Sequence, residues 1–362
     1  MKGFGRGLTV AVVGLAVVLT ASADGRVTGT THQVKGVLDF EGVACPPKGS
    51  CIAVGETPRS SHNESTGLFA TISSRGRSGS PHKVDGTSVL TAVACPEANV
   101  CFAVGSVFNS GPQHAVFVKI DHGQAGQAHS LKMDGAASIG CGSRTSCWVP
   151  GEEFPTSGGS VAAPKVVHLV NGKVDKVFSP NGSYSFSAGE AAGATPACFS
   201  ATSCILAGRS GFQQNSTGLV FSLNRGKVKV THRVAGTSGL AGLDCTSKSY
   251  CTLVGFKAEG ESEQGEVTTL SSGKVGRVRT VKNLGLFPLA CSAADACFSF
   301  GGRFANGKSE SFLVPINHGK PGNPQQIDTF IRAATCRRTH CLGVGEVGSF
   351  PNEKGTVFSF TG

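Results

Sequence analysis

The chain has 362 residues, with 33 Lys and Arg against 23 Asp and Glu and a formal net charge of +10. The basic residues are scattered along the sequence without interleaved aromatic residues, which argues against a nucleic-acid-binding protein. Beyond the N-terminal segment, no stretch has 18 consecutive apolar residues, which argues against a membrane-spanning helix there.

The first predicted element is a secretory signal over residues 1–23. A positively charged start precedes an apolar run, residues 8–19, that is too short to span a membrane comfortably. Ala21-Ser22-Ala23 fits a signal-peptidase cleavage site. We therefore expect the mature chain to begin at Asp24 and to be secreted and extracellular, and the alternative is an uncleaved membrane anchor.

From residue 45 onward the chain repeats one pattern seven times: a cysteine, a short polar turn, a second cysteine, and a glycine four residues later. Successive first cysteines are 50, 46, 57, 47, 46 and 45 residues apart, a period typical of a four-stranded propeller blade. The pairs use all 14 cysteines. We expect seven disulfides: Cys45–Cys51, Cys95–Cys101, Cys141–Cys147, Cys198–Cys204, Cys245–Cys251, Cys291–Cys297 and Cys336–Cys341.

Metal binding is the alternative role for these cysteines. Zinc sites favour two to four residues between cysteine ligands, whereas six of the pairs enclose five residues and the last encloses four. Each pair also belongs to its own repeat, so no second pair is expected nearby to complete a four-ligand site. We expect no metal and no cofactor.

The second repeat shows the expected elements most clearly. Residues 88–95 and 101–105 are apolar runs joined by a short polar turn, as in a β-hairpin. Residues 114–120 form a third predicted strand, and residues 127–133 a more polar fourth. No repeat has a helical period. The sequence therefore predicts an all-β, seven-bladed β-propeller with four strands and one short-loop disulfide per blade.

The two ends of the repeat array predict how the ring closes. The last repeat ends with a third strand, residues 355–360, and lacks a fourth. Residues 26–36 resemble fourth-strand segments such as residues 226–236. We therefore expect the mature N-terminal strand to complete the seventh blade, with residues 24–362 forming one propeller domain around a central channel. The alternative is a linear β-solenoid.

Two further residue types recur at fixed positions. The repeated glycine is expected to mark a bulge or the close approach of a neighbouring backbone. Three histidines, each four residues before a glycine, are expected on outer strands in a structural or exposed role: His32, His82 and His232. The seven repeated glycines are Gly55, Gly105, Gly151, Gly208, Gly255, Gly301 and Gly345.

The phrases VACPPKGSCIAVG, residues 43–55, and VACPEANVCFAVG, residues 93–105, resemble a repeat common in exported actinobacterial proteins. Those proteins resemble disulfide-stapled β-propellers, and most have no assigned activity. The resemblance therefore implies the fold and no particular ligand. Some copies here depart from the pattern: Cys141 is followed by Gly, Trp148-Val-Pro150 replaces the usual apolar triplet, and the last cysteine pair is one residue tighter.

Candidate site residues lie in the predicted loops between second and third strands, which are long and variable and should share one face of a propeller. Variation on one face of a uniform scaffold is typical of a binding surface, and simple drift of exposed loops is the alternative. The candidates combine possible anion contacts with acid and base groups. They are Arg59, His62, Glu64, Arg209 and Arg303.

The leading functional hypothesis is a monomeric binding module that presents these loops to a cell-surface polymer or protein. The positive charge favours solubility, with an anionic partner as the alternative. A second hypothesis is a carbohydrate-active hydrolase or lyase with carboxylates at the channel mouth. The scarcity of Trp and Tyr argues against a sugar-stacking site. A third is a purely structural envelope component.

Overall fold

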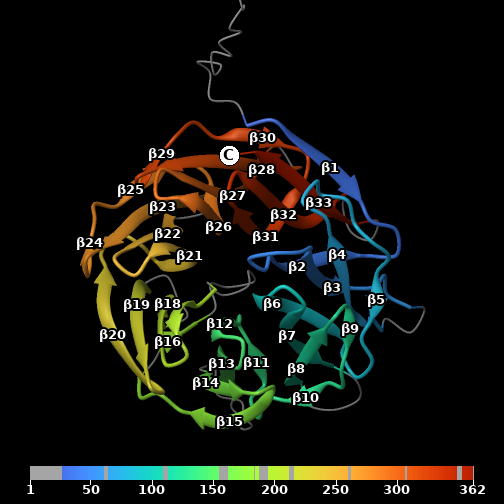
Figure 1. Ribbon diagram of the computed structural model, residues 1–362. Coiled ribbons are helices and arrows are strands. Elements are labelled where there is room, and N and C mark those ends of the chain that lie inside the picture. The colour runs from blue at the N-terminus through green and yellow to red at the C-terminus, as the bar shows by residue number, and fades with distance from the viewer. Residues whose placement is uncertain are drawn as a thin grey trace, which may run out of the picture.

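The computed structural model describes residues 27–60, 64–108, 113–154, 162–182, 184–186, 195–211, 216–259, 262–305, 308–348 and 353–361. These residues form seven antiparallel sheets arranged as blades around one axis (Figure 1). The predicted all-β, seven-bladed propeller is confirmed. None of the described residues forms a helix long and apolar enough to cross a membrane. The predicted signal and its cleavage site lie outside the described residues.

Each blade follows the chain from the inner strand outward. Blades 1 and 2 contain β2 (Asp39–Ala44), β3 (Cys51–Glu56), β4 (Gly67–Ile72), β5 (His82–Lys83), β6 (Val89–Glu97), β7 (Val100–Val107), β8 (His114–Asp121), β9 (Gln124–Ala125) and β10 (His129–Ser130). Blades 3 and 4 contain β11 (Gly135–Ala136), β12 (Gly140–Ser143), β13 (Ser146–Glu153), β14 (Ala163–Val170), β15 (Lys173–Phe178), β16 (Tyr184–Ser185), β17 (Ala197–Ser200), β18 (Ser203–Ser210), β19 (Thr217–Asn224) and β20 (Lys227–Val234).

The remaining strands build the other three blades. Blades 5 and 6 contain β21 (Gly239–Ser247), β22 (Tyr250–Glu259), β23 (Ser262–Ser271), β24 (Lys274–Val275), β25 (Arg279–Val281), β26 (Gly285–Ala293), β27 (Ala296–Ala305), β28 (Lys308–Asn317), β29 (Lys320–Pro321) and β30 (Gln325–Ile327). Blade 7 contains β31 (Phe330–Arg337), β32 (His340–Val347), β33 (Lys354–Thr361) and, as its outer strand, β1 (Gly29–Gln33).

Glycines divide the outer strand in three blades. Gly126, Gly276 and Gly322 each donate a backbone N–H to a third-strand carbonyl at 2.8–2.9 Å. They separate β9 from β10, β24 from β25, and β29 from β30. These blades therefore keep the predicted four-strand layout, with the fourth strand in two pieces.

The seven repeated glycines allow the two innermost strands of each blade to approach closely. A side-chain carbon on any of the seven would lie 1.9–2.3 Å from a carbonyl oxygen of the inner strand, nearer than any real contact. Beside the glycine, the inner strand bulges in blades 1, 2, 5, 6 and 7. The expected close approach of a neighbouring backbone is confirmed at all seven glycines, whereas the bulge lies on the inner strand and only in these five blades. The bulged residues are Glu41, Thr91, Ala241, Phe287 with Pro288, and Arg332.

All seven predicted disulfides form, and each joins the end of an inner strand to the start of the second strand. We call the end of the ring that carries these turns the disulfide face. The loops between second and third strands, and the connections between blades, leave from the opposite end, which we call the loop face. Seven disulfides fit an oxidising compartment.

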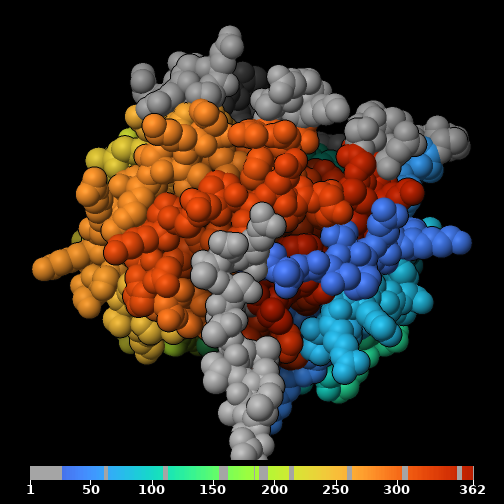
Figure 2. All heavy atoms as spheres, turned by 90° about the horizontal axis from the view of Figure 1, so that it is seen from above, coloured from blue at the N-terminus to red at the C-terminus, as the bar shows by residue number. Residues whose placement is uncertain are grey.

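The ring closes as predicted. β1 pairs antiparallel with β33 from Gly29↔Phe360 to Gln33↔Thr356, and Figure 2 shows the N-terminal strand in blue against the red C-terminal blade. Phe358 and Phe360 on β33 are buried in a cluster with aromatic side chains of blade 6. The linear solenoid is therefore wrong. His32, His82 and His232 lie on the outer strands β1, β5 and β20, as expected.

Candidate functional site

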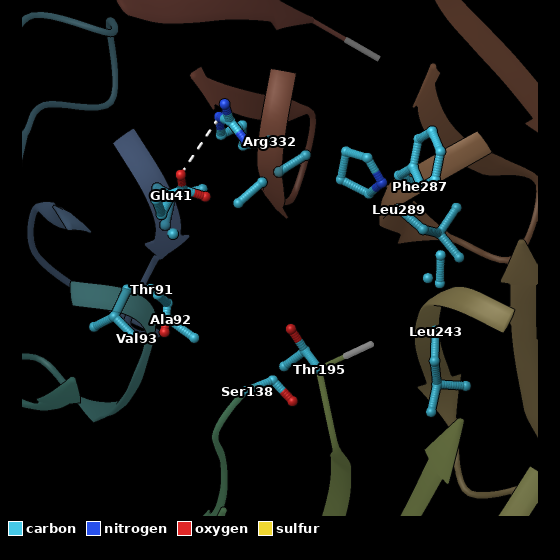
Figure 3. Close-up of a pocket in the computed structure, with 17 residues that line it drawn as sticks. Glu41, Thr91, Ala92, Val93, Ser138, Thr195, Leu243, Phe287, Leu289 and Arg332 are labelled. Carbon is cyan, nitrogen blue, oxygen red and sulfur yellow. Dashed lines mark ion pairs between the residues drawn. The ribbon is translucent and has the colours of Figure 1, made fainter. Parts of the chain in front are cut away.

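Three carboxyl groups surround one arginine where blade 7 meets blade 1. Arg332, on the bulge of β31, donates from Nε and Nη2 to Glu346 at 3.1 Å each, a bidentate pair. Its Nε also lies 3.5 Å from Glu41 Oε1 and 3.8 Å from Asp39 Oδ2. Figure 3 shows Glu41 and Arg332 on neighbouring strands. We call these four residues the channel cluster.

Asp39 is the protonated member of this cluster. Burial and the nearby Glu41 charge raise the pKa of Asp39, Arg332 acts to lower it, and the net result is a pKa of about 8. Burial also raises the pKa of Glu41, while Arg332 and a hydrogen bond with Asp39 act to lower it. No N–H or hydroxyl of the described residues reaches the buried Asp39 Oδ1. Near neutral pH, Asp39 therefore carries a proton and donates it to Glu41.

Arg332 stays charged at the centre of the cluster. Burial acts to lower the pKa of Arg332, but the carboxylates of Glu41 and Glu346 outweigh it and raise that pKa. The guanidinium thus occupies the position where the surrounding carboxylates would otherwise hold a cation. Within the described ranges, no group of three or more His, Cys, Asp or Glu side chains is arranged to hold a metal ion.

A cavity of about 60 Å³ lies between the inner strands, with Glu41 and Arg332 on one side. Leu243, Phe287 and Leu289 of blades 5 and 6 line the other side (Figure 3). This volume holds a few water molecules, since one needs about 10–15 Å³ on this measure. The cavity is therefore polar toward blades 7 and 1 and apolar toward blades 5 and 6.

Asp39 and Glu41 do not form the arrangement that carbohydrate hydrolysis requires. Two catalytic carboxyls flank the scissile bond about 5–10 Å apart, whereas Asp39 and Glu41 share a hydrogen bond with no room for a substrate between them. Glu41 is the only carboxylate among the residues that line the cavity. Asp39 and Glu41 are therefore not placed as the pair of catalytic carboxyls that the second functional hypothesis needs.

A serine–histidine–aspartate relay lies in blade 3. Ser146 Oγ is 2.9 Å from His168 Nε2, and His168 Nδ1 is 3.0 Å from Asp175 Oδ2. Ser146, however, is buried and donates its hydroxyl proton to the carbonyl of Ala201 in blade 4 at 2.7 Å. The serine is thus committed to a backbone acceptor, and the relay joins two blades.

Trp148, which departs from the usual motif, belongs to the same junction. Its indole Nε1–H donates to the Ala201 carbonyl at 3.0 Å, and its ring stacks on His168 with centroids 4.0 Å apart. One carbonyl of blade 4 therefore receives two donors from blade 3, which explains the tryptophan structurally.

The structure places the first group of predicted site residues in one exposed loop. Arg59 and Glu64 are exposed after β3, and the Glu64 carbonyl accepts the backbone N–H of Ser60 at 2.8 Å. His62 lies outside the described residues.

The two other predicted arginines lie on different blades. Arg209, on β18 of blade 4, is half-buried; burial lowers its pKa while the Glu152 carboxylate raises it. Arg303, on β27 of blade 6, is 2.6 Å from Glu310 Oε2, and its guanidinium lies 4.9 Å from the centroid of the Phe312 ring. Blades 1, 4 and 6 are not neighbours, so the fold does not gather the three arginines into one pocket.

Exposed apolar side chains were not among the predicted site residues. Of the four large hydrophobic side chains exposed in the described ranges, Phe108, Phe154 and Phe330 lie at strand ends on the loop face, 51%, 44% and 36% exposed. The fourth, Val177, lies on the outer strand β15. The sequence does contain a signal for two of them, because Phe108 and Phe154 each stand three residues after a repeated glycine, where the second strand is expected to end.

Hydrogen bonds fix the backbone beneath two of these aromatic rings. The Phe108 N–H donates to Ser88 Oγ at 3.0 Å, and the Phe154 N–H donates to Asp134 Oδ2 at 2.6 Å. Both acceptors belong to the connection that leads into the same blade. The two exposed rings are therefore attached to ordered backbone, which lowers the entropy cost of binding.

No family model and no curated protein matches the chain. Among solved structures, the β-propeller domain of the Trilobed protease from Pyrococcus furiosus is similar, with a TM-score of 0.53 and 8% identity, covering 90% of this chain and 94% of that chain. Hydrazine synthase from Kuenenia stuttgartiensis is similar with a TM-score of 0.58 and 11% identity, covering 88% of this chain and 96% of that chain. At these identities the likeness shows the propeller fold alone.

Proposed function

We propose that this protein is a secreted, monomeric binding module whose loop face engages a protein partner at the cell surface. The observation that carries the proposal is the placement of Phe108, Phe154 and Phe330 at one end of a uniform scaffold. The three rings belong to blades 2, 3 and 7, and large apolar groups exposed on one face of a soluble protein are candidates for an interaction site. Aromatic side chains are enriched among the residues that dominate binding energy in protein interfaces. A phenylalanine ring supplies apolar contact area, which suits a protein partner better than a sugar, because a sugar also requires polar contacts.

The predicted polar residues fit the rim of such a surface. Arg59 and Glu64 are exposed on the same face in blade 1. Charged groups at a rim set association rate and specificity more than affinity. We therefore expect Arg59→Ala to weaken binding less than Phe108→Ser.

Site-specific crosslinking tests the proposal. A photoreactive phenylalanine analogue replaces Phe108 or Phe154 in the full chain, and the matched control carries it at Val177, the exposed apolar position away from the loop face. We expect the first two to crosslink the same protein on cells that secrete this chain, and the control to crosslink none. With that partner purified, Phe108→Ser with Phe154→Ser should weaken binding at least about tenfold, with Val177→Ser unchanged.

Two results would contradict the proposal. Crosslinking at Val177 as efficient as at Phe108 would show no preference for the loop face. Crosslinks to polysaccharide alone would replace the protein partner with a cell-surface polymer.

Secretion has its own test. The mature protein recovered from culture medium should begin at Asp24 by N-terminal sequencing. A chain retained in the cell membrane with residues 1–23 attached would support the uncleaved anchor instead.

A further inference from the structure

Basic side chains gather on the outer strands of blades 4 and 5. The segments 225–233 and 274–282 hold eight Lys and Arg and no Asp or Glu. All are exposed except Arg279, which is partly buried. We call this set the basic belt: Arg225, Lys227, Lys229, Arg233, Lys274, Arg277, Arg279 and Lys282.

The belt is continuous across the boundary between the blades. β20 is the outermost strand of blade 4, and β24 and β25 are outermost in blade 5 (Figure 1). His232 Nε2 on β20 lies 2.9 Å from the carbonyl of Gly273, in the turn before β24. Arg279 in turn donates to the Gly319 carbonyl of blade 6 at 2.9 Å. The two segments are about 40 residues apart in sequence, so the basic residues look scattered until the ring forms.

One buried carboxylate lies beside the belt, that of Glu266, which accepts a hydrogen bond from Thr280 at 3.1 Å. None of the ion pairs formed within the described residues includes a member of the belt. Along β20, Lys227, Lys229 and Arg233 are exposed while Val228 and Val230 between them are partly buried. Residues two apart on one strand face are about 7 Å apart, so the strand presents a row of cationic groups.

Protection of a sheet edge does not account for this density of charge. Lysines on edge strands hinder edge-to-edge aggregation. The outer strands of two other blades, however, contain no Lys or Arg: β9 and β10 in blade 2, and β1 in blade 7. A general need for edge protection would therefore leave the difference between these blades and blades 4 and 5 unexplained.

We propose that the basic belt binds a linear polyanion, a chain bearing phosphate, carboxylate or sulfate groups, along the rim of blades 4 and 5. This site is separate from the loop face and independent of the function proposed for it. A polymer with regularly spaced anionic groups can pair with several belt residues at once and release its counterions.

The shape of the rim favours a flexible polymer over a membrane. The outer strands follow the convex edge of a ring (Figure 1), and a flat anionic surface would touch only a narrow part of it. The exposed side chains of β20 and β25 include no aromatic ring on which a base could stack. These features favour a polyanion without bases over both a membrane and a nucleic acid.

Binding of fluorescent long-chain polyphosphate to the mature, oxidised protein tests the proposal, with polygalacturonate as the carboxylate probe. We expect affinity to fall steeply between 50 and 200 mM NaCl. The belt variant carries Lys227→Ala, Lys229→Ala, Arg233→Ala, Lys274→Ala and Arg277→Ala, and should bind at least about tenfold more weakly. These side chains are exposed, so far-UV circular dichroism should show an unchanged fold.

A second variant, which loses the same number of positive charges outside the belt, distinguishes an effect of the belt from an effect of net charge. It carries Lys35→Ala, Lys48→Ala, Arg75→Ala, Arg77→Ala and Lys83→Ala, five exposed residues outside the belt. We expect the affinity of this variant for the polymer to fall by less than about threefold. Equal losses in the two variants, or no polymer binding at 50 mM NaCl, would overturn the proposal. Tighter binding to phosphatidylglycerol vesicles or to a single-stranded oligonucleotide than to either polymer would also overturn it, in favour of a membrane or a nucleic acid.

Discussion

Asp39 makes the pH dependence of stability testable at a single position. Its pKa is raised to about 8 in the folded protein, against about 3.9 in an unfolded chain. At a pH between these two pKa values, the folded state holds a proton on Asp39 that the unfolded state has lost. The free energy of unfolding therefore falls as the pH rises through this range. Asp39→Asn stays neutral and can still donate to Glu41.

We expect Asp39→Asn to flatten the pH dependence of stability. Urea unfolding at pH 5 and pH 8 should show a smaller fall in the variant than in the wild type, whose slope cannot exceed about 1.4 kcal/mol per pH unit from one group. Asp85→Asn, at an exposed carboxyl in the same blade, is the control and should leave the slope unchanged. The same slope in Asp39→Asn and the wild type would contradict the assignment of the proton to Asp39.

Gly255 tests the close approach of the two inner strands. An alanine methyl there would lie 2.0 Å from the Gly239 carbonyl oxygen, so the backbone would have to move. We expect Gly255→Ala to lower the free energy of unfolding by about 2 kcal/mol or more, measured by urea unfolding. Gly126→Ala is the control, because an alanine methyl there would lie 3.4 Å from the nearest atom, an ordinary contact. A comparable loss of stability in Gly126→Ala would show that the effect comes from replacing any glycine and not from the close approach.

Site residues were harder to predict than the fold because the sequence does not show which inner-strand positions face the channel. Glu41 and Arg332 both stand four residues before the first cysteine of their repeats. They are nearly 300 residues apart and become neighbours only where the ring closes. The five predicted candidates were chosen because their loops vary, and loop sequence alone does not determine which side chains meet.

At the scale of elements, the junction between blades 3 and 4 depends on one carbonyl. Ala201 accepts from both Trp148 and Ser146. Trp148→Phe keeps an aromatic ring against His168 and removes one donor, and should cost about 1 kcal/mol in thermal or urea unfolding.

A double-mutant comparison sharpens this prediction. Ser146→Ala alone leaves the tryptophan donor in place, whereas the double variant leaves a part-buried carbonyl without either side-chain donor. We expect the double variant to lose more than the sum of the single losses. Thr145→Ala, at an exposed neighbouring position, should have little effect. Strictly additive losses would show that the two donors act independently.

The strands themselves were predictable because the cysteine pairs mark the same turn seven times. Each pair fixes the end of one strand and the start of the next, so alternating apolar runs could be assigned in order. The breaks in the outer strands were not predicted. Gly126, Gly276 and Gly322 look like ordinary turn glycines in the sequence, and only the third-strand carbonyl that accepts each N–H distinguishes them.

At the scale of the whole molecule, β1 is the strand that holds the ring closed. A chain shortened to begin at Val34 would uncover β33, including Phe358 and Phe360. We expect its Tm to fall by about 5 °C or more, since loss of a paired strand costs several kcal/mol. It should also self-associate through the exposed edge, as measured by light scattering.

Addition of the missing strand in trans provides the control. A synthetic peptide of residues 24–33 should restore Tm and suppress association, and a scrambled peptide of the same composition should not. A shortened chain as stable and monomeric as the full one would show that β1 does not stabilise the ring.

The sequence separations of the disulfides also bear on the order in which this molecule assembles. Each bridge joins cysteines five or six residues apart, while β1 pairs with a strand more than 320 residues away. Short loops close quickly, and wrong cysteine pairings would need loops of about 40 residues or more. A chain emerging N-terminus first can therefore oxidise one blade at a time without a search among alternative pairings. Its first strand, however, must wait for the last strand to appear, so ring closure should be the final and slowest event of folding.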